Sequence, residues 1–185
     1  ETFTITNIGA SIFGKLQEAT LAAAVAQDQA MSSFIKATGA NEGYVNTIST
    51  TFVETRHLGV SMEEAGGALE SLYTQMADFT TLSPQTRAQL VKNVALMNEF
   101  GISTSVSSEA LDTMTRVLGM SATEAADLSL EMVNMAERIG VPPAKLMQEL
   151  SATAPMLAHW GDQAVDVFMD LQASAKATGI EIGNL

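Results

Sequence analysis

The stretch His57-Leu58-Gly59-Val60-Ser61-Met62-Glu63-Glu64 holds the end of one helix and the start of the next. A glycine in the left-handed conformation ends a helix, and the apolar residue after it can fold back onto the last turn. Ser61 with Glu64 then fits the capping box, in which two side chains satisfy free backbone N–H groups at the start of a helix. The stretch therefore predicts a tight junction between two helices.

This junction recurs along the chain. Successive gaps of 20, 42, 18, 21, 21 and 18 residues separate the glycines at positions 39, 59, 101, 119, 140, 161 and 179. The gap of 42 spans two units, and Leu82-Ser83-Pro84 fills its middle with a stop and start that lacks glycine. Ser121 with Glu124 repeats the capping box, and Pro142 can occupy an early helical position. We expect each of these glycines to close one helix.

Between the junctions, apolar residues recur at helical spacing, as in Ala65, Leu69, Leu72, Met76 and Phe79. Helices this short are marginal alone, so they must pack on one another, as a compact bundle or as a superhelical array. The predicted fold class is all-α. It comprises about eight short capped helices, near residues 19–37, 43–57, 62–79, 84–99, 105–118, 122–139, 142–158 and 162–177.

Two further features concern packing. Gly66-Gly67 inside a predicted helix costs about 1 kcal/mol per glycine relative to Ala, which a close helix crossing would offset. The 11 methionines are interpreted mainly as core residues, because they stand at helical spacing.

The N-terminal region differs from the rest. Thr2-Phe3-Thr4-Ile5-Thr6 alternates as a strand does. We predict a short extended N-terminal segment or arm over residues 1–18, followed by an all-helical, repeat-like domain over 19–185. The absence of an initial Met and the position of Leu185 just after a new junction lead us to expect an excerpt from a longer chain.

Composition excludes several functions. The chain has 185 residues, of which 21 are acidic and 9 basic, giving a net charge of −12. This balance argues against specific nucleic-acid binding, which needs clustered Lys and Arg. Zero Cys removes disulfides, thiolate nucleophiles and Cys-ligated zinc. The longest apolar run, Leu21 to Ala26, is too short for a membrane segment.

The strongest chemical motif is Gly9-Ala10-Ser11-Ile12-Phe13-Gly14-Lys15-Leu16. A phosphate-binding loop of the form G-x-x-x-x-G-K needs Ser or Thr next, because that hydroxyl ligates Mg²⁺, and Leu16 stands there instead. Alternating strands that would position such a loop are not predicted downstream. We interpret the motif as a glycine-containing lead-in to the first helix.

Other candidate residues have structural interpretations. His57 and His159 lie near predicted helix ends and lack ligand-spaced partners. Trp160 is the single Trp, interpreted as an anchor at a helix junction or, alternatively, as an interface residue. Glu63-Glu64 fits the first turn of a helix, where the dipole favours acids. We predict no catalytic, cofactor-binding or metal-binding residue, no cofactor and no enzymatic activity.

The repeated junction also carries a family resemblance. Ala37-Thr38-Gly39-Ala40, then His57-Leu58-Gly59-Val60-Ser61-Met62-Glu63-Glu64-Ala65, then further helices closed by Gly, resemble the helical core region of tail tape measure proteins of tailed bacteriophages. The likeness covers residues 34–150, and Ala177-Thr178-Gly179-Ile180 echoes its start. This chain is much shorter than members of that family.

The resemblance implies a structural virion protein that sets tail length during assembly and leaves ahead of the genome at infection. It implies a location in the tail tube lumen or tail tip, and a homo-oligomer in the virion. The implied partners are tail tube proteins, tail-tip or baseplate-hub proteins, and assembly chaperones. The matching residues would fix helix geometry only: Gly59, Ser61, Glu64, Gly119, Ser121 and Glu124.

Two other functions stay open from the sequence. One is a non-enzymatic helical-repeat adaptor or scaffold that binds a partner helix along a Met-rich groove. The other is an enzyme built on the near phosphate-binding loop at Gly9–Leu16, which binding of a nucleotide with Mg²⁺ would reveal.

Overall fold

A computed structural model describes residues 5–179 and, among the side chains, those of residues 21–179 except 42, 45 and 162. Eight α-helices account for most of these residues and no strand occurs among them, which confirms the all-α prediction. The helices are α1 (Ile5–Thr38), α2 (Val45–Thr55), α3 (Met62–Gln75), α4 (Pro84–Glu99), α5 (Thr104–Arg116), α6 (Ala122–Ile139), α7 (Pro143–Leu157) and α8 (Ala164–Thr178). Short 3-10 segments lie between some of them: η1 (Glu42–Tyr44), η2 (Arg56–Leu58), η3 (Phe79–Thr81) and η4 (Ala158–Gln163).

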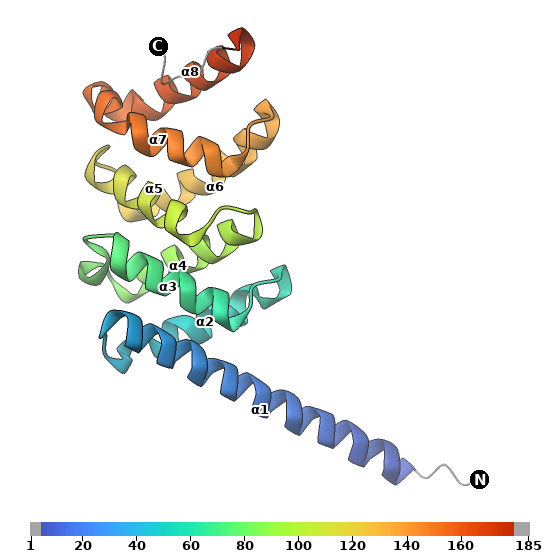
Figure 1. Cartoon of the computed structure of the whole chain (residues 1–185). Helices are drawn as coiled ribbons and strands as arrows, with labels where there is room; N and C mark the ends of the chain where they lie inside the picture. Colours follow the sequence, from blue (N-terminus) through green and yellow to red (C-terminus); the bar gives the residue numbers. More distant parts are fainter. Residues whose placement is uncertain (1–4, 180–185) are drawn as a thin grey trace.

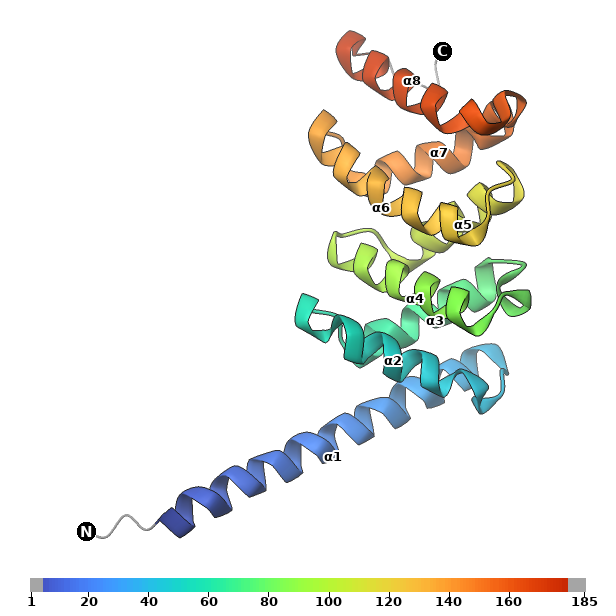
Figure 2. The same ribbon diagram turned by 180° about the vertical axis from the view of Figure 1, so that it is seen from behind.

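The helices form an elongated array of two layers (Figure 1). Helices α1, α3, α5 and α7 stack on one another in one layer, and α2, α4 and α6 stack in the other, as the reverse view shows (Figure 2). Each consecutive pair, α1–α2 through α7–α8, is one two-helix unit, and each unit packs on its neighbours along the array. The structure thus selects the array over the compact bundle.

Glycines end the helices as the sequence predicts. All seven glycines of the repeat have positive φ, and no other described residue does. At Gly140 the Val141 amide donates to the Ala136 carbonyl at 2.9 Å and the Gly140 amide donates to Glu137 at 3.2 Å, which is the Schellman arrangement. The apolar residue after the glycine folds inward, since Val60 and Ile102 are buried. The next helix therefore starts after only three connecting residues at Gly140 and four at Gly101.

Serine hydroxyls cap the N-terminal ends of four of the helices. Ser61, Ser83, Ser103 and Ser121 each accept a hydrogen bond from a backbone amide three residues later. The capping boxes at Ser61 and Ser121 are complete, with the Glu carboxylate accepting from the serine amide in each. Ser83 caps the junction that lacks a glycine, ahead of Pro84.

The structure corrects three boundaries. The extended segment predicted for residues 1–18 is wrong from Ile5 onward, because α1 starts there, while residues 1–4 lie outside the described part. A lone strand would leave its backbone groups without a partner, whereas a helix satisfies them internally. Helix α3 ends at Gln75 rather than at 79, and Phe79 is buried from η3 instead. Pro142 precedes α7, and Pro143 is its first residue.

An aromatic cluster joins the first two units. The Phe34 ring from α1 lies 5.6 Å from the ring of Tyr44 and 5.6 Å from that of Tyr73, both edge-on, and Tyr44 stacks on Phe79. Arg87 on α4 donates to the Tyr44 hydroxyl at 2.9 Å. These contacts connect α1, η1, α3, η3 and α4, so the cluster fixes how the first unit lies on the second.

Methionine fills the core along the array. Seven of the methionines are buried, as the core interpretation predicts: Met31, Met62, Met76, Met97, Met114, Met132 and Met147. An unbranched thioether adapts to irregular gaps between small residues, and alanines such as Ala65, Ala95 and Ala126 are buried beside them. Most methionine side chains therefore belong to the core. They do not line an exposed groove, as the adaptor function would require.

We predict that Gly101→Ala lowers the free energy of unfolding by about 1–2 kcal/mol, because φ at this position is +78° and an L-residue is strained there. An added Cβ would meet no atom within 4 Å, so the loss isolates backbone strain from steric clash. Urea denaturation measures it. Gly101→Asn is the matched control and should lose less, because Asn tolerates the left-handed region. Equal stability of Gly101→Ala and the parent chain would contradict this role of the glycine.

Candidate interaction surface

The two histidines are not brought together. His57 is exposed in η2 near one end of the array, and His159 is exposed in η4 near the other (Figure 1). The His159 Nδ1 lies 3.3 Å from the Met156 carbonyl, in keeping with its interpretation as a helix-end residue. Among the described residues, no group of three or more His, Cys, Asp or Glu side chains could hold a metal ion.

The glycine motif at residues 9–16 lies inside α1. In a phosphate-binding loop, successive backbone amides leave their regular hydrogen bonds and converge on the phosphates. In a helix, the same amides donate to carbonyls four residues earlier. The motif therefore has neither the backbone of a phosphate-binding loop nor the place of a lead-in, because the first helix already includes it.

Glu63 and Glu64 have different surroundings. The Glu64 carboxylate accepts from the Ser61 amide at 2.7 Å and also faces Asn98 Nδ2 at 3.4 Å. The Ser61 hydroxyl first, and then its backbone amide, hold the pKa of the Glu64 carboxyl below its ordinary value. Ser121 lowers the pKa of Glu124 in the same way. Glu63 is exposed and points to a groove between helices.

Trp160 lies at the junction of α7 and α8, as predicted, but half of its surface is exposed (49%). Met156, one turn earlier, is 68% exposed. The backbone bends at Gly161, where φ is 52° and ψ is −126°. Trp160 is therefore not a buried anchor.

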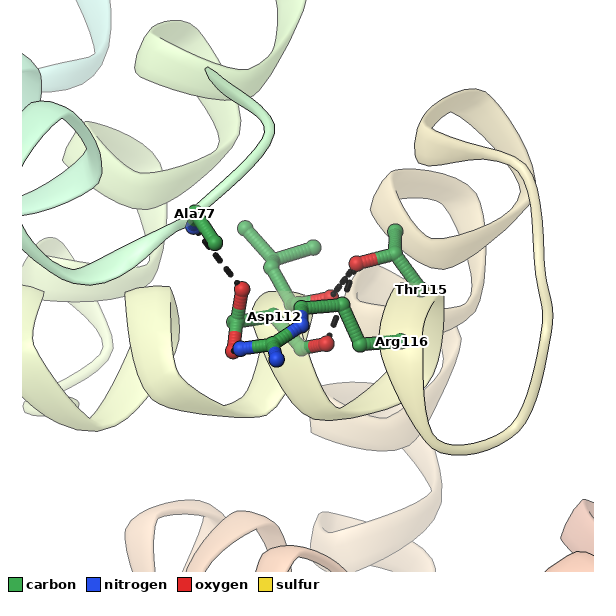
Figure 3. A network of polar contacts seen from close by, with 5 residues as sticks. Ala77, Asp112, Thr115 and Arg116 are labelled. Carbon is green, nitrogen blue, oxygen red and sulfur yellow. Dashed lines mark hydrogen bonds and ion pairs between the residues drawn. The ribbon is translucent and has the colours of Figure 1, made fainter.

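The connection after α3 is held by Asp112 (Figure 3). One oxygen of its carboxylate, Oδ1, accepts from the Ala77 amide at 3.0 Å, and the other lies 3.4 Å from Arg116 Nη1. Thr115 on the same helix donates to the Leu111 carbonyl. Asp112 thus ties the chain between α3 and η3 to α5, which satisfies an amide that a longer α3 would have used internally.

The most enclosed of the concave surfaces described here lies between α1 and α3. We name it the α1–α3 groove; its volume is about 520 Å³ and its lining residues are Ala26, Gln29, Ala30, Ser33, Glu63, Gly66, Gly67 and Glu70. Sequence reasoning missed this groove. The Gly66-Gly67 pair was its signal, because two glycines in a helix lower its surface as well as allowing a close crossing.

The two glycines have different roles. A Cβ on Gly66 would stand 3.2 Å from the Ala30 Cβ, so Gly66 permits the close crossing of α1 over α3 that the sequence predicts. A Cβ on Gly67 would meet no atom within 4 Å, so Gly67 faces open space. The close crossing of α1 and α3 explains why glycine is needed at position 66 but not at position 67. At position 67 the missing side chain makes the groove deeper.

Two other hollows are less confined. One, of about 530 Å³, runs along a single face of α1 and includes Ala24, Asp28, Met31 and Lys36. The other, of about 220 Å³, lies at the ends of α5 and η4 beside Gly119 and Gly161. Neither has two like charges among its lining residues, as the α1–α3 groove has with Glu63 and Glu70 of α3.

Comparisons with protein-family models, with curated proteins and with solved structures each found no match for this chain. Within the described part of the chain, every helix is too short or too polar to cross a membrane.

We predict that Ser61→Ala raises the pKa of Glu64 toward its ordinary value, measured by NMR titration of the side-chain carboxyl. Because the folded-state pKa is depressed, the stabilisation is present above the unfolded pKa of about 4.3 and is lost as pH falls through the folded value. The cost of Ser61→Ala, about 1 kcal/mol near neutral pH, should therefore shrink on acidification. Glu124 is the internal control, and a matching rise of its pKa would contradict a local cause.

We predict different effects of two neighbouring substitutions on the free energy of unfolding. Gly67→Ala should raise the free energy of unfolding by about 0.5–1 kcal/mol, because Ala is the better helix former and the methyl has room. Gly66→Ala should bring no such gain, because α1 must move away from the new methyl. Thermal and urea denaturation of both variants measure the difference. Equal stabilisation would show that the crossing at Ala30 is looser than described.

Proposed function

We propose that this chain is a structural virion component that resembles a phage tail tape measure protein, located in the tail tube or tail tip. The observation that carries the proposal is the repeated junction, whose matching residues take up structural positions. Gly59 ends one helix and Ser61 with Glu64 starts the next, and Gly119, Ser121 and Glu124 do the same.

The array suits a length-setting role. Each two-helix unit packs only on its neighbours, so the length of such an array grows with the number of units. A protein that fixes the length of a tail by its own extent needs this property. A compact bundle would lack it, because adding helices there increases girth as well as length.

The charge of the chain supports the same role. With a net charge of −12, its surface repels DNA, so a genome could pass the protein without sticking. The proposed partners are tail tube proteins, tail-tip or baseplate-hub proteins and assembly chaperones, with several copies in each virion. The proposal includes no enzymatic step, and the protein would leave ahead of the DNA at infection.

Deleting one two-helix unit from the parent gene tests the proposal. An in-frame deletion of residues 102–140 removes α5 and α6 and joins Gly101 directly to Val141, two equivalent positions of the repeat. We predict virions with shorter tails by electron microscopy, and peptides of this chain by mass spectrometry of purified particles. The point variant Gly67→Ala is the control and should leave tail length unchanged.

Two results would contradict the proposal. One is the absence of the chain from purified virions. The other is a tail of unchanged length in particles that contain the shortened protein. A parent reading frame that encodes little more than these 185 residues would count against it as well, because so short an array could not span a tail.

An adaptor that binds a partner helix is the second candidate, favoured by the α1–α3 groove and by the N-terminal half of α1, which projects beyond the stack (Figure 2). Leu21 and Val25, near the middle of α1, are exposed (67% and 48%). This function predicts that the chain is absent from virions.

A further inference from the structure

We draw no further inference here: the strongest candidate, the exposed apolar face of α1 that includes Leu21 and Val25, is an unpartnered surface patch, and nothing in the structure shows what covers it.

Discussion

The backbone must reverse direction after every helix, and at every connection except the one between α3 and α4 it does so through a glycine with positive φ. Only glycine adopts that conformation without strain, and it lets the next residue fold inward and the next helix start at once. Gly101 is an example. Its amide donates to the Asn98 carbonyl, the Ile102 amide donates to the Met97 carbonyl, and the Ile102 side chain is fully buried. Short connections force each helix to lie against its neighbours, which limits the fold to a compact bundle or a stacked array.

Polar contacts then fix one unit on the next. The Asn93 amide on α4 donates to the Ala126 carbonyl on α6 at 3.0 Å, in a buried position. Lys176 on α8 donates to the Gly140 carbonyl, which places a cation at the C-terminal end of α6 where the dipole favours it. These contacts join neighbours only. Stability is therefore close to a sum over units and interfaces, and the ends of the array open more readily than its middle.

Local signals predicted the helices well, because caps are local: the glycine and the Ser61–Glu64 pair act within five residues. The predictions that failed concern features that depend on residues far away in the sequence. Helix α3 stops early where Asp112, 35 residues after Ala77, accepts the Ala77 amide. The stacking into two layers could not be deduced either, since bundle and array use the same junctions. The α1–α3 groove was missed because Gly66 and Gly67 are indistinguishable until Ala30 is placed against one of them.

The chain consists of stacked two-helix units, and glycines with positive φ close all but one of the connections between its helices. Native-state hydrogen exchange of the Phe168→Leu variant, resolved at single amides, tests this most directly, because Phe168 is fully buried in the last unit. We predict that amides of α7 and α8 lose protection while those of α2 and α3 keep it. An equal loss of protection in α2 and α3 would contradict it and show one cooperative globule.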